Sequence, residues 1–161
     1  MEHAAVKTPI GTVELAVDRG ALVSLEFVEA SPLPPDEPFG IAARVRAYFA
    51  GDLDAIDIVP VRFDRGTPFQ HEVWAALRTI PVGETISYAE LARRVGRPGA
   101  FRAVGAANGQ NPVGVVVPCH RVIAADGTLG GYGGGLDRKR WLLAHEGALE
   151  PARATLPGIT V

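Results

Sequence analysis

Cys119 is the single cysteine of this 161-residue chain, and His120 follows it directly. A thiolate is the nucleophilic form of cysteine, and a nearby imidazole or cation favours it over the thiol. One cysteine cannot form an intramolecular disulfide or a multi-thiolate zinc site. The pair therefore indicates nucleophilic chemistry, and the plainer alternative is that Cys119 is a small buried apolar residue.

Glu146 is the third residue that could take part in this chemistry. It follows Leu142 by four positions and Leu143 by three, so it lies on the apolar face of a helix expected to begin near Asp137. A carboxylate directed at a core is unfavourable unless it is paired. We interpret Glu146 as the acid that orients His120, with a frayed helix end or a salt bridge to an arginine as alternatives.

The segment around the cysteine is apolar and interrupted by proline. Residues 115–117 and 122–124 are candidates for buried strands, and Pro118 takes the thiol out of a regular strand. Because adjacent side chains of an extended chain point to opposite sides, contact between Cys119 and His120 requires a bend or a bridging water.

Composition excludes several classes of protein. Hydrophobic residues make up 47% of the chain and charged residues 21%, unlike disordered, collagen-like or coiled-coil chains. There is no run of membrane-spanning length and no signal-peptide pattern, so we expect a soluble cytoplasmic protein. Residues 1–60 carry four Lys/Arg against ten Asp/Glu, a net charge of −6, whereas residues 85–140 carry eight against three, a net charge of +5. The basic second half favours a polyanionic partner, with an ordinary solvated face as the alternative.

The pattern of elements predicts two lobes and an α+β fold class. Apolar residues cluster or alternate over residues 4–7, 12–18 and 22–28, which predicts a small antiparallel sheet. A proline-rich loop at 31–38 precedes a predicted helix over 39–51. We expect a sheet-and-helix lobe over residues 1–60, a linker at 61–66 and a second lobe over 67–161.

The second lobe begins with helix-start signals. Capping boxes at 67–70 and 87–90 each open a predicted helix, the second ending near Val95. A glycine-containing break at 96–99 leads to a further helix over 100–108, which is typical of a helix-turn-helix. That last helix carries Arg102 and then small residues, which favours contact with DNA over close packing against a neighbouring helix.

The glycine-rich run at 130–135 is not a phosphate loop, because it lacks the required Lys-Ser/Thr ending. We interpret its glycines as allowing backbone to approach a flat ligand, with Tyr132 as a stacking wall. The alternative is a merely flexible loop.

Taken together, these motifs resemble the O6-alkylguanine-DNA alkyltransferases, which repair alkylated DNA. The resemblance covers about residues 67–147, and in the first lobe it extends only to the general pattern. It rests on PCHRV at 118–122, NP at 111–112, RAVG at 102–105, SY at 87–88, GYGGG at 131–135 and LLAHEG at 142–147. It implies a helical second lobe with a winged helix-turn-helix-like DNA-binding element.

The resemblance also implies roles for residues near the thiol. Cys119 would accept the alkyl group, with His120 acting through a water as its base. Glu146 would orient the histidine, and Asn111 would brace the turn beneath the cysteine. Tyr88 would contact the guanine after base flipping, which the chemistry needs because a stacked O6-alkyl carbon is out of reach of a thiolate.

The remaining implied roles concern DNA. Arg102 would enter the base stack, and the small residues Ala103 and Gly105 would suit the minor groove. The extruded base would be held by four residues, Val122, Tyr132, Gly133 and Gly134. Phe101 departs from many relatives, which have a smaller residue before the arginine; it could act as a wedge or alter the fit to the groove.

The implied function is irreversible, single-turnover transfer of the alkyl group from O6-alkylguanine in double-stranded DNA to the cysteine, by a monomer without cofactor or metal. Eukaryotic members carry zinc in the first lobe, but here that lobe offers only His3 and no cysteine. Alternatives are a lesion-binding protein with an inert thiol and a cysteine hydrolase. Activity on O4-alkylthymine, the range of alkyl sizes, cooperativity on DNA and the role of residues 148–161 stay open.

Overall fold

The computed structural model describes residues 1–33 and 40–149, and these form two compact units. One unit comprises Met1–Asp64 together with Pro112–Val116, and the other comprises Arg65–Asn111 and the chain from Val117 onward. Most of the predicted loop at 31–38 and nearly all of the 148–161 segment lie outside the described residues. Within the described residues, no helix is long and apolar enough to cross a membrane.

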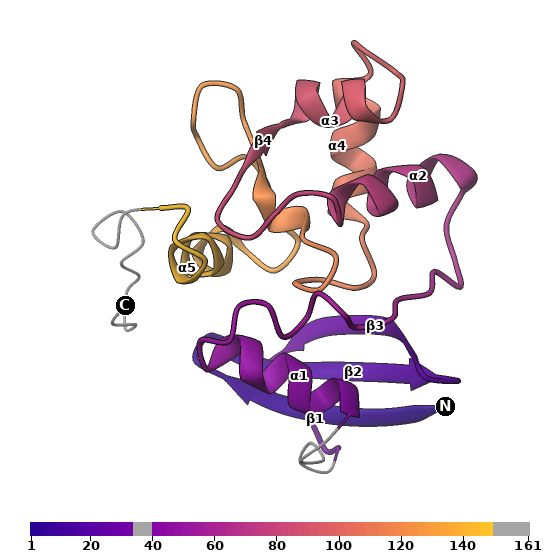
Figure 1. Ribbon diagram of the computed structural model, residues 1–161, viewed down its shortest axis with the longest axis vertical. Helices are drawn as coiled ribbons and strands as arrows, with labels where there is room; N and C mark the ends of the chain where they lie inside the picture. Colours follow the sequence, from indigo (N-terminus) through magenta and orange to yellow (C-terminus); the bar gives the residue numbers. More distant parts are fainter. Residues whose placement is uncertain (34–39, 150–161) are drawn as a thin grey trace. The chain divides into compact units, whose positions relative to one another are not determined.

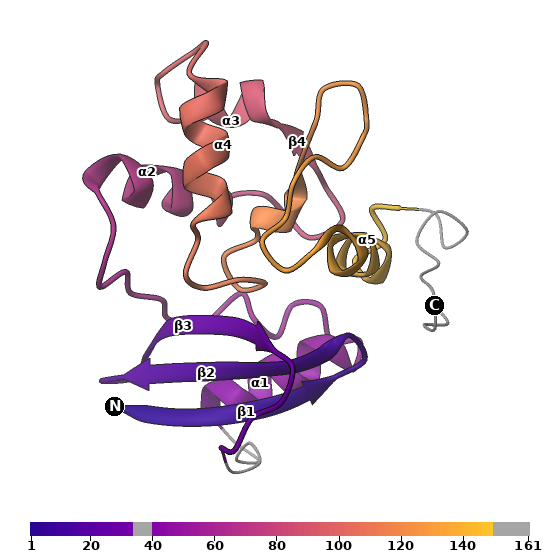
Figure 2. The same ribbon diagram turned by 180° about the vertical axis from the view of Figure 1, so that it is seen from behind.

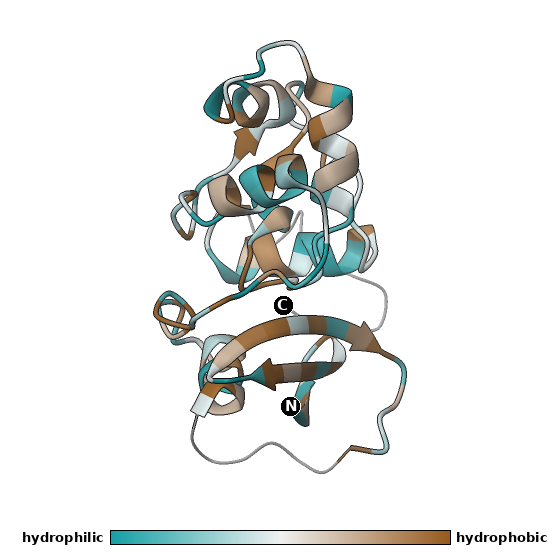
Figure 3. Cartoon of the chain, turned by 90° about the vertical axis from the view of Figure 1, so that its right-hand side faces the viewer, coloured by the Kyte–Doolittle hydropathy of each residue, from teal (hydrophilic) through white to brown (hydrophobic). Residues whose placement is uncertain are grey.

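The first unit is a three-stranded antiparallel sheet with one helix on its face. Strands β1 (Glu2–Thr8), β2 (Gly11–Asp18) and β3 (Ala21–Val28) pair in sequence order, as the hydrophobic pattern predicts. Helix α1 (Gly40–Phe49) lies against the sheet in both views (Figures 1 and 2). Its buried residues face the hydrophobic positions of the strands, which Figure 3 shows in brown between polar ones.

In the second unit, local capping sets where two helices begin. Helix α2 (Pro68–Leu77) starts at Thr67 with the complete predicted capping box: the Thr67 hydroxyl accepts from Gln70 N, and the Gln70 side chain accepts from Thr67 N. Helix α3 (Tyr88–Arg94) follows the two-residue strand β4 (Ile86–Ser87), and its Ser87 cap accepts from Glu90 N. The Glu90 carboxylate pairs with arginines of its own helix, so the predicted box is realised only in its first half.

Helix α4 (Phe101–Gly109) completes the helix-turn-helix with α3. Its inner face is fixed to α2 by the buried indole of Trp74, whose Nε1 donates to Ala107 O at 2.8 Å. Strand β4 pairs in parallel with β5 (Val122–Ile123), which connects this motif to the cysteine segment. The predicted α+β fold class is therefore confirmed, while the wing of the helix-turn-helix stays a prediction.

The apolar run before the cysteine is buried but is not a strand. Residues 115–117 form turns, and Val115 has a φ of +69°, a backbone conformation that β-branched residues rarely adopt. The prediction of a strand at 115–117 was thus wrong, and the predicted strand over 122–124 is limited to β5. The sequence pattern indicates burial, but within the described residues no strand pairs with this segment to hold it extended.

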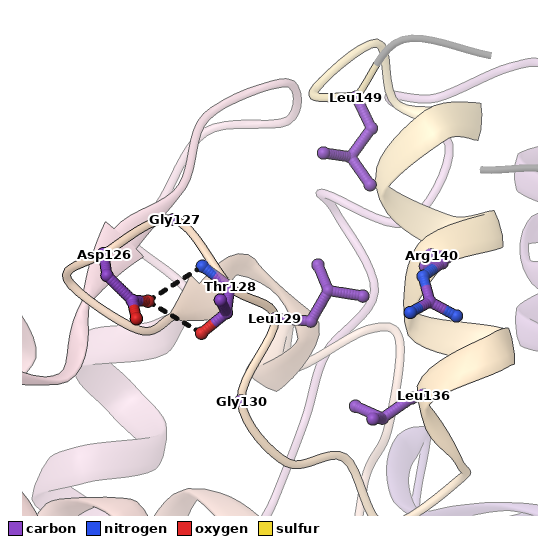
Figure 4. Close-up of a pocket in the computed structure, with 8 residues that line it drawn as sticks. All are labelled: Asp126, Gly127, Thr128, Leu129, Gly130, Leu136, Arg140 and Leu149. Carbon is purple, nitrogen blue, oxygen red and sulfur yellow. Dashed lines mark hydrogen bonds between the residues drawn. The ribbon is translucent and has the colours of Figure 1, made fainter. Parts of the chain in front are cut away.

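The last part of the described chain follows the cysteine segment and ends in a helix. After a turn in which Asp126 Oδ1 accepts from the backbone and the hydroxyl of Thr128 (Figure 4), the glycine-rich run leads into α5 (Leu136–His145). The side chains of Leu129 and Leu136 point into the space between this loop and α5 (Figure 4). Leu142 and Leu143 on α5 are fully buried.

Candidate active site

Cys119 begins a single 3-10 turn, η1 (Cys119–Arg121), whose three residues are all buried. This turn is the bend that brings neighbouring side chains into one site. Two amides hold its backbone: Asn111 Nδ2 donates to Val117 O at 2.8 Å, and Asn108 Nδ2 donates to Cys119 O at 3.3 Å. Cys119 is 8% exposed, so little of the residue is open to solvent.

A buried charged chain lies behind the cysteine. His120 Nε2 is 2.9 Å from Glu146 Oε2, and both side chains are fully inaccessible to solvent. Arg121 donates to both oxygens of the same carboxylate at 2.9 Å and to Ile80 O at 2.6 Å. Glu146 therefore has both partners that the sequence analysis considered for it, the histidine and an arginine.

The protonation of this chain follows from its neighbours. Burial by itself would raise the pKa of Glu146, but the hydrogen bonds from His120 and Arg121 and the charge of Arg121 outweigh it and hold the pKa well below its usual range. An ionised carboxylate only accepts hydrogen bonds, so His120 Nε2 carries the hydrogen. In the neutral imidazole, Nδ1 is then the acceptor and can serve as a base.

The thiol itself is held in its neutral form by the protein. Burial raises the pKa of Cys119, while a hydrogen bond with the Asn111 side chain and the charge of Lys139 act in the opposite direction. A base is therefore needed to produce the thiolate at neutral pH.

Lys139 belongs to this site although the sequence analysis did not single it out. It lies on α5, is fully buried, and its Nζ donates to three backbone carbonyls, those of Val122, Leu129 and Gly131, at 2.7, 2.5 and 3.0 Å. Burial lowers the pKa of Lys139 to about 8. Its cation holds the two ends of the loop between β5 and the glycine-rich run together. The helical spacing of Lys139 to Leu142 and Leu143 was the signal that could have found it.

Tyr88 and the glycine-rich run meet next to the cysteine. A Cβ at Gly130, where φ is +70°, would lie 2.7 Å from the Tyr88 hydroxyl, so only glycine fits there. Gly105 of α4 also faces Tyr88 rather than open space. Burial raises the pKa of Tyr88 and raises that of Tyr132 well above its usual value, so both phenols stay protonated and able to donate.

The other predicted site residues fall into two groups. Phe101, Arg102 and Ala103 are exposed at the start of α4, Phe101 being 50% accessible. Val122 is buried, and its carbonyl accepts from Lys139 but keeps a second lone pair for another donor. In the glycine-rich run, Gly133 is exposed and Gly134 accepts from Arg138.

The sequence of this chain is similar to those of known proteins. Residues 68–148 match the sequence profile of the 6-O-methylguanine DNA methyltransferase DNA-binding domain. A methylated-DNA–protein-cysteine methyltransferase of Mycolicibacterium paratuberculosis is 49% identical over 97% of this chain and 98% of its own length. A relative with the same name from Shigella flexneri is 59% identical over 70% of this chain, which corresponds to 65% of that relative's length.

Solved structures agree with the sequence comparison. The crystal structure of Mycobacterium tuberculosis OGT in complex with DNA matches with a TM-score of 0.79 and 46% identity, and the match covers 96% of this chain and 95% of that one. The similarity thus includes the first unit, where the sequence motifs are few. The chain belongs to the methylated-DNA–protein-cysteine methyltransferase family.

Proposed function

We propose that this protein repairs DNA by direct reversal, moving the alkyl group from the O6 atom of an alkylated guanine to the sulfur of Cys119. The observation that carries the proposal is the buried cysteine on a turn whose next residue, His120, is hydrogen-bonded to an ionised Glu146. Membership of the family gives the substrate class. The partner is double-stranded DNA, and no cofactor enters the chemistry.

The chemistry balances with the groups present. The thiol proton passes through a water to His120 Nδ1, and the resulting imidazolium is stabilised by Glu146. The thiolate attacks the alkyl carbon; the carbon–O6 bond breaks as the carbon–sulfur bond forms, and the guanine leaves with the electron pair and takes up a proton. The product is a thioether, which has no route back to the thiol. Each molecule therefore acts once.

The DNA roles are those that the family resemblance implies, and the exposure of Arg102 and Ala103 supports them. Arg102 at the start of α4 enters the stack when the damaged nucleotide leaves it, and Ala103 lets the helix approach the minor groove. Gly105 lies beside the ring of Tyr88, where an added Cβ would make an ordinary van der Waals contact at 3.7 Å. The flipped base is held by five residues: Tyr88, Tyr132, Gly133, Gly134 and, through its carbonyl, Val122.

Asn111 supports the turn that carries the cysteine, through its bond to Val117 O. We also propose that the protein works in the cytoplasm, because reducing conditions there keep a reactive single thiol from being oxidised.

One observation favours a second candidate, a protein that binds alkylated DNA without reacting. Burial raises the pKa of Cys119, so the resting thiol is a poor nucleophile. We favour transfer because the bond to Glu146 holds the hydrogen of His120 on Nε2, which leaves Nδ1 as an acceptor for that proton through a water.

The intact mass of the protein, measured after incubation with a duplex that contains one O6-methylguanine, tests the proposal. We expect one added methyl group, mapped to the Cys119 peptide, in proportion to the lesion lost. Cys119→Ser should bind the same duplex with similar affinity but gain no mass. An unchanged wild-type mass with tight binding would establish the second candidate, and recovery of a free thiol after turnover of a substrate would indicate a hydrolase.

A further inference from the structure

Two buried side-chain atoms at the cysteine turn lack a hydrogen-bond partner among the residues that the structure describes. They are Asn108 Oδ1 and His120 Nδ1. Asn108 is 4% exposed and His120 is fully buried. Buried polar atoms in native proteins are paired with protein groups or with ordered water. Both atoms belong to residues that adjoin Cys119, since Asn108 Nδ2 donates to its carbonyl and His120 follows it in the chain.

The hydrogen-bonding roles of the two atoms are fixed by their other bonds. Asn108 Nδ2 faces the carbonyl oxygen of Cys119, and only the nitrogen of the amide can donate to it, so Oδ1 is an acceptor. His120 Nε2 faces the ionised Glu146, so Nδ1 of the neutral ring is also an acceptor. Two residues that adjoin Cys119 thus each offer an acceptor, and the thiol of Cys119 is a donor.

A single water matches this set, because it donates two hydrogen bonds and accepts from the thiol. We propose that Asn108 is a positioning residue, which holds the water that carries the proton from Cys119 to His120. The thiol proton moves to the water oxygen as one water hydrogen moves to His120 Nδ1. The second water hydrogen stays on the water and is donated in a hydrogen bond to Asn108 Oδ1, which orients the water. This inference rests on the proposed transfer reaction and adds a residue to it.

The location of Asn108 connects the water to the DNA-binding element. Asn108 lies in the last turn of α4, the helix that presents Arg102 at its other end. Its side chain is on the buried face with Val104 and Ala107, so it does not meet DNA directly. A substitution there changes the proton transfer without removing a DNA contact.

Asn108→Leu keeps the side chain's approximate size and removes both hydrogen bonds. The assay is the rate of Cys119 alkylation by iodoacetamide from pH 6 to pH 10, which needs no DNA and no base flipping. Charged and titratable groups around the thiol are unchanged by the substitution. They are Lys139 on α5, the phenols of Tyr88 and Tyr132, and the His120–Arg121–Glu146 cluster.

We expect Asn108→Leu to react about tenfold more slowly than wild type near pH 7, since a positioned base contributes roughly 10²- to 10⁴-fold and only its water is disturbed. The two proteins should converge at high pH, where hydroxide ionises the thiol without a relay. Gln110→Leu, an exposed amide at the end of the same helix, should match wild type throughout.

A purely structural role for Asn108 would slow the reaction by the same factor at every pH, and this result would overturn the proposal. So would wild-type rates across the whole range. Methyl uptake from the O6-methylguanine duplex by the wild-type protein, measured in parallel, reports separately on the proposed function.

Discussion

Glu146→Gln tests the buried charged chain most directly. Glutamine has nearly the same shape, but its amide nitrogen would face N–H groups of His120 or Arg121 that now donate to a carboxylate oxygen. Arg121, whose side chain is 5% exposed, would remain as a buried cation without a counter-ion. Breaking a buried ion pair in this way costs about 3–5 kcal/mol, out of a typical total stability of about 5–15 kcal/mol.

The same substitution removes the group that fixes the hydrogen on His120 Nε2. Loss of a correctly oriented base lowers a rate by about 10²- to 10⁴-fold, and we expect methyl transfer to fall by roughly 10²-fold. The two effects are measured separately. Urea unfolding gives the stability, and single-turnover reaction with free O6-benzylguanine, which needs no base flipping, gives the rate.

A double variant separates charge burial from chemistry. Arg121→Met combined with Glu146→Gln removes the unpaired cation and leaves mainly Ile80 O without its donor. An unsatisfied buried carbonyl costs about 1–3 kcal/mol, so the double variant should be more stable than Glu146→Gln alone. Its transfer rate should stay low. An unfolding free energy of Glu146→Gln within about 1 kcal/mol of the wild-type value, or a wild-type rate in the double variant, would contradict this role of Glu146.

Three further predictions follow from the same geometry. Because the pKa of Glu146 is lowered from 4.5 in the folded state, its stabilisation is complete above pH 4.5 and is lost as pH falls below that value; acid titration of urea unfolding should show this loss in wild type and not in Glu146→Gln. Lys139→Met removes the donor from the buried carbonyl of Val122 and from the less buried carbonyls of Leu129 and Gly131, and should destabilise the fold by about 1–3 kcal/mol, which calorimetry would measure, whereas Lys139→Arg keeps the charge and should lose less. Arg102→Ala should slow repair of duplex DNA by at least about tenfold while leaving the reaction with free O6-benzylguanine unchanged, and equal losses on both substrates would contradict its role in base flipping.

Local sequence signals predicted the helices of the second unit well. The Thr67 box satisfies backbone groups within four residues of each other, so its outcome depends little on the rest of the fold. The Glu90 half of the second box failed because Arg93 and Arg94 lie one turn further along the same helix and attract the carboxylate. A side chain with two local options cannot be assigned from spacing alone.

In the segment before the cysteine, local sequence signals were not sufficient to predict the structure. Val115, Val116 and Val117 are β-branched and buried, which are the properties of a strand. Whether such residues form a strand depends on a neighbouring strand with unpaired hydrogen-bonding groups, and the nearest long strand, β3, makes only an isolated bridge at Val113. The chain therefore turns here, and the positive φ of Val115 is a strain that the surrounding packing has to compensate.

Lys139 could have been predicted by the argument that found Glu146. It precedes Leu142 by three positions and Leu143 by four, so it shares their buried face. Its neighbours Arg138 and Arg140, however, are typical of an exposed segment. The periodicity predicts that Lys139 is buried, yet its partners are carbonyls of a separate loop, which no spacing reveals.

Two opposite charges thus lie on one face of α5, and each acts on a different part of the reaction. The cation of Lys139 favours the thiolate of Cys119, and the anion of Glu146 favours the protonated His120 that forms with it. Both charges stabilise the same ion pair, so losing either should make the thiol harder to ionise.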